Sequence, residues 1–388
     1  MRWSALSIGL LALVSLTACK TMPLAAMPAT MVKSAVADET GPGQWKVIDY
    51  ARAPTVDDII DDLTSRRVIF VGESHERYHH HLSQLTIIQR LHARGIPLAI
   101  GLEMIHQPFQ QALDDYVAGR IDETEMLRRT EYFDRWKFDF RLYRPIFAFA
   151  RKHGIPLRAL NVPSEVTRAV GEKGIAALPP ELRRQLPESL DRDLAGYRER
   201  IAAVFGHHPG AKDRNIEHFI EVQLIWDEGM AEAAARYLRE HPERTMVVLA
   251  GAGHVVDTGI PQRLQRRLAV PMATVLQLDS GLDLSAAPAD YVILAQAQEL
   301  PPAGLIGVVL KQADRGMEIA SIAEDSHAAE AGVAVGDRLI EINRAPIEKL
   351  ADVRLQLWHR KPGDRVQLVL LRGKGAFVRT LEVEVELK

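Results

Sequence analysis

The chain has 388 residues and a formal net charge of −3, with charged residues of both signs mixed along it. This length suggests two domains after an N-terminal segment, and a hydrophobic content of 47% is sufficient for sizeable cores. The sequence shows no basic footprint of a nucleic-acid-binding protein and no Gly-rich phosphate loop, so we expect neither nucleic-acid nor nucleotide binding.

Residues 1–19 have the features of a targeting segment. Arg2 supplies a positive charge, and residues 6–16 form an apolar core that is too short to span a bilayer comfortably. The core ends in Leu-Thr-Ala-Cys19, which resembles a bacterial lipobox, and Cys19 is the only cysteine, so no disulfide can form within one chain. We predict a lipid anchor on Cys19; a plain secretory signal cleaved near Ala26 is the alternative. Lys20, by resemblance to bacterial sorting signals, favours the outer membrane, facing the periplasm. Residues 20–44 are expected to be a flexible tether.

The stretch Val-Ile-Phe-Val-Gly-Glu-Ser-His over residues 68–75 predicts a buried strand that leads into a helix. Glu73 and His75 would then lie at a strand-to-helix turn, where ligands bind in open α/β sheets. Residues 246–250 form a second apolar run, which ends in Gly-Ala-Gly-His254, and residues 98–102 form a third, which ends in Glu103. If the three strands are parallel neighbours, His75, Glu103 and His254 converge at one edge. The alternative is that the glycines only make turns and each histidine caps a helix or bonds a backbone carbonyl.

The remaining elements alternate between strands and helices, which predicts a mainly parallel sheet covered by helices on both faces. Aromatic-rich helices over 107–152 are inserted between strands and could form a roof over the ligand edge. Residues 155–162 predict a strand that brings Asn161 to the same edge. Residues 179–211 are expected to be helical, and a helix over 212–239 could present Gln223 and Asp227 on one face. Two further strands are predicted over 273–278 and 291–294.

Residues 304–388 resemble a PDZ domain, a small, mainly β binding module. The segment Gly-Leu-Ile-Gly-Val-Val over 304–309 is similar to a PDZ peptide-binding loop, and residues 328–343 are similar to the core segment with its Ala-Gly and Gly-Asp turns. The resemblance implies that a peptide, as a C-terminus or an extended strand, binds between this segment and a helix over 350–359. The predicted peptide-binding residues are Leu305, Ile306, Gly307 and Val308.

Residues 45–298 resemble the ChaN family of iron-regulated, haem-binding bacterial lipoproteins. The resemblance rests on Val-Gly-Glu-Ser-His at 71–75, Gly-Leu-Glu-Met at 101–104, Asn-Val-Pro at 161–163, the helix over 223–230 and Ala-Gly-Ala-Gly-His-Val at 250–255. It implies haem bound through a tyrosine-type ligand, with cofacial haems across a possible homodimer. The wider group includes Tiki-type metalloproteases, TraB proteins and metal-independent erythromycin esterases.

Two functions follow from the resemblance. In the first, the chain is a cell-envelope lipoprotein that binds haem for haem or iron uptake, with the PDZ domain engaging a peptide or protein partner. The candidate haem-site residues are His75, Glu103, His254, Tyr78, His79, Tyr132 and Tyr143. Haem would also need an apolar pocket and cations for its propionates, supplied by Phe133, Trp136, Met104, Arg77 and Arg144.

In the alternative function, the chain is a metal-dependent hydrolase of the Tiki or esterase type, and its PDZ domain recruits substrates. His75, Glu103 and His254 would bind zinc or another divalent metal, leaving a position open for water, and Glu73 would be the general base.

Overall fold

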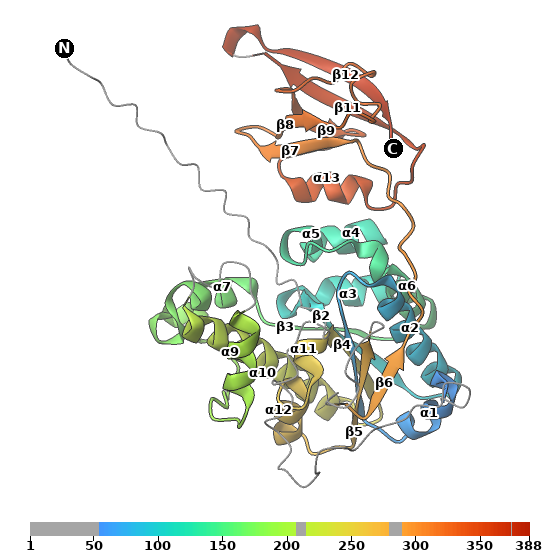
Figure 1. The fold of residues 1–388 in the computed structure, drawn as a ribbon, viewed down its shortest axis with the longest axis vertical. Coiled ribbons are helices and arrows are strands. Elements are labelled where there is room, and N and C mark those ends of the chain that lie inside the picture. Colours follow the sequence, from blue (N-terminus) through green and yellow to red (C-terminus); the bar gives the residue numbers. More distant parts are fainter. Residues whose placement is uncertain (1–53, 207–214, 279–288, 374) are drawn as a thin grey trace, which may run out of the picture.

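The computed structural model describes residues 54–206, 215–278, 289–373 and 375–388 (Figure 1). The first domain is built on a six-stranded sheet with the order β3-β2-β4-β1-β5-β6, in which every pair of neighbours is parallel. Its strands are β1 (Val68–Glu73), β2 (Leu98–His106), β3 (Leu157–Asn161), β4 (Thr245–Gly251), β5 (Met272–Leu278) and β6 (Tyr291–Leu294). The predicted α/β class is confirmed, and so is the prediction that β1, β2 and β4 are neighbours.

Helices cover both faces of this sheet, which is why its central strands are buried throughout and are mainly apolar before their carboxyl ends. Alternate side chains of β1 point to opposite faces. Ile69 and Val71 join a core with α1 (Val56–Leu63), α2 (Tyr78–Ala93) and α6 (Arg144–His153), whereas Val68 and Phe70 join a second core with α10 (Ile216–Glu240) and α12 (Ile260–Arg267). Residues 68–73 are buried without exception.

The segment between β2 and β3 forms the inserted helices that the sequence predicted. They are η3 (Gln107–Phe109), α3 (Gln110–Val117), α4 (Glu123–Arg129), α5 (Tyr132–Arg135) and η4 (Phe140–Leu142), followed by α6. In Figure 1, α4 and α5 lie between the parallel sheet and the second domain. We call residues 130–143 the roof segment.

Between β3 and β4, α7 (Ser164–Lys173) and η5 (Ile175–Ala177) precede α8 (Pro180–Arg183), α9 (Tyr197–Gly206) and α10. The expectation that residues 179–211 are helical was wrong over residues 184–196, and its last residues, 207–211, lie outside the described residues. Pro187 disfavours a helical conformation in the residue before it, and Gly196, directly before α9, has a φ of 75°, which lies outside the right-handed helical region. In the part of the chain that the structure describes, we found no helix with the length and apolar character needed to cross a membrane.

The second domain contains an antiparallel sheet with the order β12-β11-β9-β8-β7 and the short strand β10 paired to β9. Its elements are β7 (Val308–Gln312), β8 (Met317–Ile322), β9 (Arg338–Ile342), β10 (Ala345–Pro346), α13 (Leu350–Leu357), β11 (Arg365–Arg372), η8 (Gly375–Phe377) and β12 (Arg379–Glu386). The predicted PDZ architecture is confirmed. β7 lies at an edge of the sheet, and α13 faces the first domain (Figure 1).

Candidate functional site

The carboxylate of Glu73, at the end of β1, is held by two histidines. Its Oε1 lies 2.7 Å from His75 Nδ1, and its Oε2 lies 2.6 Å from His81 Nδ1. Burial by itself raises the pKa of Glu73, but His81 and His75 outweigh it and hold that pKa far below its usual range. Burial likewise lowers the pKa of His81, yet the Glu73 carboxylate raises it overall. Glu73 and His81 therefore form a buried ion pair.

His75 is oriented by contacts on its ring and on one nitrogen. Its Nδ1 donates to Glu73 Oε1, and its ring packs against Trp136 and Phe138, with centroids 4.6 Å and 4.9 Å away. A carboxylate that accepts from Nδ1 fixes the tautomer and leaves Nε2 as the nitrogen with a lone pair. His75 is therefore set up to offer Nε2 to a ligand or a substrate.

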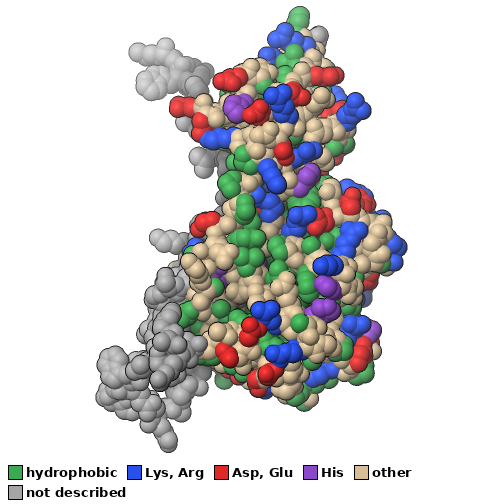
Figure 2. Space-filling model, turned by 90° about the vertical axis from the view of Figure 1, so that its right-hand side faces the viewer, with side chains coloured by type: hydrophobic (Ala, Val, Ile, Leu, Met, Phe, Trp, Pro, Cys, Tyr) green, Lys and Arg blue, Asp and Glu red, His purple; other side chains and the backbone are tan. Residues whose placement is uncertain are grey.

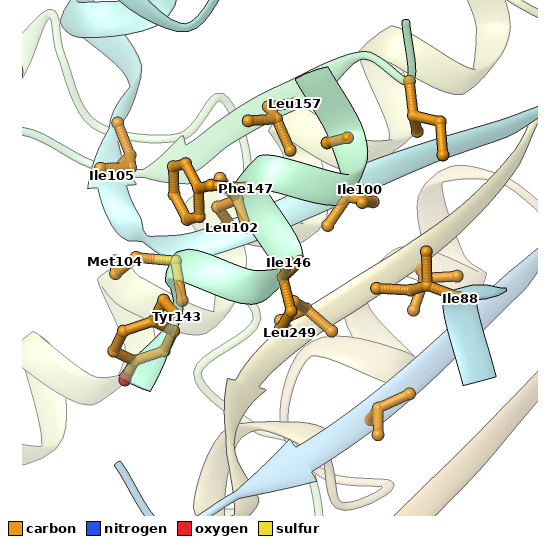
Figure 3. Close-up of a cluster of buried hydrophobic side chains, with 14 of the residues drawn as sticks. Ile88, Ile100, Leu102, Met104, Ile105, Tyr143, Ile146, Phe147, Leu157 and Leu249 are labelled. Carbon is orange, nitrogen blue, oxygen red and sulfur yellow. The ribbon is translucent and has the colours of Figure 1, made fainter. Parts of the chain in front are cut away.

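The roof segment reaches the same carboxylate through Tyr143. The Tyr143 hydroxyl donates to Glu73 Oε1 at 3.1 Å and accepts from Trp136 Nε1 at 3.2 Å. Figure 3 shows the Tyr143 ring beside Met104 at the border of the buried cluster, with its hydroxyl directed away from the apolar side chains. Burial and the Glu73 charge raise the pKa of Tyr143 well above 10, so its hydroxyl stays protonated.

A second cluster forms at the ends of β2 and β4. His254 lies in the short helix α11 (Ala252–Val255), with Nδ1 2.6 Å from Asp227 Oδ1 of α10 and Nε2 3.6 Å from Glu103 Oε1. The Tyr197 hydroxyl donates to Asp227 Oδ2 at 2.9 Å, and the Gly251 amide donates to Glu103 Oε2 at 2.7 Å. Burial lowers the pKa of His254, but Asp227 and Glu103 together raise it. His254 is thus a buried imidazole between two carboxylates.

Gly72 allows α11 to sit against β1. A Cβ atom at this position would meet Val255 Cγ2 at 2.6 Å and Leu276 Cδ2 at 2.7 Å. Such distances are far below normal carbon contacts, so a larger residue would displace α11. The absence of a side chain at Gly72 therefore helps to position His254, which lies in α11.

Several buried polar atoms near this edge make no hydrogen bond within the described residues. They are His106 Nδ1, Asn161 Oδ1, Tyr132 Oη and Arg200 Nη2. Buried polar groups are nearly always paired, with protein, water or ligand. These polar atoms are therefore available to bind ordered water or a ligand at this edge of the sheet.

His106 gives a pH-dependent prediction. Burial, assisted by the Arg135 charge, lowers its pKa to about 4. Its unfolded pKa is about 6.5, so the unfolded chain binds this proton first and stability is lost as the pH falls from 6.5 towards 4. From pH 7 to pH 4.5 the loss at this site is expected to be roughly 2 to 3 kcal/mol. Urea unfolding of wild type and His106→Gln at both pH values measures it. If His106→Gln loses as much stability as the wild type between the two pH values, His106 is not the source of the loss. His241→Gln, at a half-exposed histidine, is the control and should lose as much as the wild type.

A cavity of about 340 Å³ opens beside the first cluster. Its walls come from the start of α2, the roof segment and the connection to the second domain. It is lined by Glu76, Arg77, Tyr78, His79, Lys137, Phe138, Asp139, Leu142, Gln298, Glu299 and Leu300. This volume is within the range of about 300–1,000 Å³ that is usual for small-molecule sites.

The site residues predicted from the sequence lie in the Glu73 cluster, the His254 cluster, the cavity and the roof segment. Glu103 meets His254, whereas His75 pairs with Glu73. Tyr78 and His79 line the cavity, and Tyr132 and Tyr143 are buried in the roof segment, where burial and nearby carboxylates also raise the pKa of Tyr132 well above 10. Across residues 54–388, masked gaps excepted, no group of three His, Cys, Asp or Glu side chains is arranged to hold a metal. Cys19 lies outside the described residues.

Three contributors to these clusters were not assigned a role from the sequence. His81 is the third histidine of the run at 79–81, and the sequence does not indicate which of the three contacts Glu73. Tyr197 comes from a helix far from the motifs in sequence. Arg200 donates to the Gly253 carbonyl at 2.9 Å and to Thr258 Oγ1 at 2.9 Å. By contrast, the helical spacing did indicate that Asp227 could face a site.

Comparisons with known proteins match both domains. A family model described as haem-binding uptake, Tiki superfamily, ChaN matches residues 59–264, and a PDZ domain model matches residues 304–387. The solved structure of cofacial haem binding to ChaN of Campylobacter jejuni is 19% identical, with a TM-score of 0.50, and covers 62% of this chain and 92% of that one. An erythromycin esterase mutant in its open conformation is 15% identical, with a TM-score of 0.37, and covers 62% of this chain and 78% of that one.

A curated protein is also similar to part of the chain. The periplasmic pH-dependent serine endoprotease DegQ of Escherichia coli is 26% identical over 181 residues, which are 46% of this chain and 36% of that protein. The chain therefore spans about a third of the length of this relative. Because the ChaN model matches more than half of the chain, and the fold agrees with it, the chain belongs to the haem-binding ChaN family of the Tiki superfamily and carries a C-terminal PDZ domain.

Proposed function

We propose that the chain binds haem in the cavity beside His75, where the phenol oxygen of Tyr78 would bind the iron. The observation that carries the proposal is the lining of this cavity. Haem needs an axial donor, an apolar surface for its ring and cations for its propionates. The cavity offers Tyr78 as the donor, Phe138, Leu142 and Leu300 as the apolar surface, and Arg77 and Lys137 as the cations. The residues present therefore fit the group.

The environment of the tyrosines favours Tyr78 over the other candidates. A tyrosine binds ferric iron as a phenolate, so a raised pKa opposes ligation. Tyr143 is fully buried and its hydroxyl is engaged by Glu73 and Trp136. Tyr132 is buried and its pKa is raised, whereas Tyr78 is half-buried and lines the cavity. His79, also in the lining, is the competing donor.

Bound haem would supply an iron centre whose ligand field the protein sets, while the chain's own residues hold and shield it. Arg77 and Lys137 would bind the carboxylates, and Phe138 would cover the apolar ring. Glu73, fixed by His75, His81 and Tyr143, would keep the roof segment in place over the site. We propose a role in haem or iron uptake.

A haemin titration of the chain from Lys20, followed by absorption spectroscopy with metal analysis of the same sample, tests this proposal. We expect a saturable shift of the Soret band and no stoichiometric zinc. A sample that holds one tightly bound divalent metal and shows no Soret shift would contradict it.

Hydrolysis is the second candidate, and one observation favours it. Two imidazoles, His75 and His254, each have Nδ1 on a carboxylate, and Glu103 lies close to His254 Nε2. Such pairs suit general acid–base chemistry without a metal. If this reading holds, His254→Gln abolishes ester or peptide hydrolysis but leaves haemin affinity unchanged. Absence of turnover by the wild type on nitrophenyl esters and casein peptides would eliminate it.

We further propose that Cys19 carries a lipid anchor and holds the protein at the outer membrane, facing the periplasm. The lipobox-like sequence before this cysteine supports the proposal. We expect wild type in the outer-membrane fraction. Cys19→Ser is expected outside the membrane fractions, because the thiol that accepts the lipid is gone. Sucrose-gradient fractionation with palmitate labelling measures both. An unlabelled wild type would contradict the anchor.

A further inference from the structure

Helix α13 packs in the core of the PDZ domain and also against the first domain. Val353 and Leu357, one turn apart, pack in the PDZ core. Ala351 and Leu355, also four residues apart, pack against the core of the first domain. Residues at this spacing share a helix face, so α13 has one face for each domain.

Polar and aromatic contacts hold α13 on the roof segment. Lys349 Nζ lies 2.6 Å from Asp134 Oδ2, and Arg354 Nη1 donates to the Lys137 carbonyl at 3.0 Å. Trp358, just after the helix, is 92% buried, and its ring lies 5.4 Å from that of Phe140. Figure 2 shows the junction as a waist where apolar and Lys or Arg side chains gather. The PDZ domain is therefore docked rather than merely tethered.

The docked segment is the one that builds the candidate site. Lys137 and Phe138 line the cavity, and Phe138 packs on His75. The neighbouring Trp136 contacts His75 and, through Tyr143, the Glu73 carboxylate. The connection between domains adds a second link, because residues 298–300 line the cavity and Arg141 Nη1 donates to the Pro301 carbonyl at 2.8 Å.

A PDZ domain binds an extended peptide along an exposed sheet edge, which here is β7, and the resemblance to PDZ domains implies that α13 lies on the other side of that peptide. The backbone amides of Ile306 and Gly307 make no backbone hydrogen bond within the described residues, and Leu305 and Val309 are 58% and 59% exposed. Free amides before an edge strand suit an extended peptide that ends in a carboxylate. A peptide in this groove would contact the helix that holds the roof segment.

We propose that peptide binding in the groove between β7 and α13 and ligand binding in the cavity are energetically coupled through the docking of α13. The identity of the cavity ligand as haem rests on the function proposed above. Coupling between two sites is reciprocal: the peptide changes haem affinity by the same factor as haem changes peptide affinity. The two states are α13 docked and α13 displaced from the roof segment.

The test uses the chain from Lys20 and a decapeptide with a free carboxylate, selected on that chain from a library displayed with free C-termini. We expect saturating peptide to change the haemin Kd at least fivefold, the lower end of couplings that typically span about 5–150-fold, and haemin to change the peptide Kd equally. Failure to select any peptide, or a haemin Kd that the peptide leaves unchanged, would overturn the proposal.

Undocking variants separate coupling from binding. Lys349→Ala combined with Arg354→Ala removes two polar contacts with the roof segment and is expected to bring the coupling below twofold. Trp358→Ala, which also removes the hydrogen bond from Trp358 Nε1 to Thr124 Oγ1, provides a second route. Arg365→Ala, which removes exposed ion pairs with Glu384 and Glu386 between β11 and β12, at the edge of the sheet away from β7, is the matched control and should keep the coupling. Coupling that survives in both undocking variants would contradict the role of α13.

Hydrogen exchange distinguishes failure of this proposal from failure of the haem proposal. If haemin does not bind, peptide addition must still change amide protection in residues 130–143, because that segment is the one α13 holds. A change there would support the coupling with a different cavity ligand. Unchanged protection would overturn the coupling itself.

Discussion

Replacing Glu73 with glutamine is expected to lower the free energy of unfolding by about 3 kcal/mol or more. The carboxylate is 1% exposed and meets His75, His81 and Tyr143. Removing one partner of a buried ion pair typically costs about 3–5 kcal/mol, because the other charge stays buried without compensation. Glutamine keeps the shape but not the charge, so His81 must lose its proton or remain unpaired.

The pH dependence of this loss follows from the direction of each pKa shift. The pKa of Glu73 is lowered, so its contribution is present above about pH 4.3 and is lost as pH falls through the folded value. The pKa of His81 is raised, so its contribution is present below about pH 6.5 and is lost as pH rises through the folded value. The difference between wild type and variant is therefore expected to be largest between these two values and smaller above the folded pKa of His81.

Denaturant unfolding at several pH values measures this difference. Glu76→Gln, the same chemical change at an exposed position three residues later, is the control and is expected to stay within about 0.5 kcal/mol of wild type. A Glu73→Gln protein as stable as wild type across the range would show that the pair is not formed as described.

Tyr78→Phe is expected to weaken haemin binding on the order of a hundredfold, which corresponds to about 2.8 kcal/mol. The substitution removes the donor oxygen and keeps the ring, so the apolar lining of the cavity is unchanged. The position and shape of the Soret band should change with the ligand. Titration of both proteins with haemin under the same conditions measures the ratio of the two dissociation constants.

A second tyrosine provides the matched control. Tyr291 lies at the start of β6, whereas the candidate site lies where the strands of the sheet end. Its hydroxyl donates to Asp62 Oδ2 of α1. Tyr291→Phe should bind haemin like the wild type. If Tyr78→Phe also binds like the wild type while His79→Ala does not, the axial donor is the histidine.

Much of this architecture could be predicted from local sequence patterns. The apolar runs at 68–71, 98–102 and 246–250 indicated buried parallel strands, and the structure places them side by side. Their polar ends, Glu73, Glu103 and His254, indicated a site at one edge. The structure brings these residues to one edge because parallel strands bring their carboxyl ends together whatever their order, and the site itself stays a prediction.

The pairing within the site could not be predicted in the same way. Of the three residues expected to converge, Glu103 and His254 adjoin, whereas His75 pairs with Glu73, two residues away. Asp227 from α10 completes the His254 cluster. Which side chains meet depends on how α2, α10 and the roof segment pack, and packing involves contacts distant in sequence. The docking of α13 on the roof segment likewise could not be predicted, because the roof segment lies more than 200 residues earlier in the sequence and the apolar Ala351 and Leu355 do not indicate which surface they cover.

Haem retention measures the central claim most directly. The chain from Lys20 would be mixed with excess haemin and passed through a gel-filtration column, and the haem in the protein peak would be counted by the pyridine haemochrome assay. Our account predicts a fixed, saturable number of haems per chain that falls in Tyr78→Phe. A protein peak that elutes without haem, or that takes up haem without saturating, would contradict it.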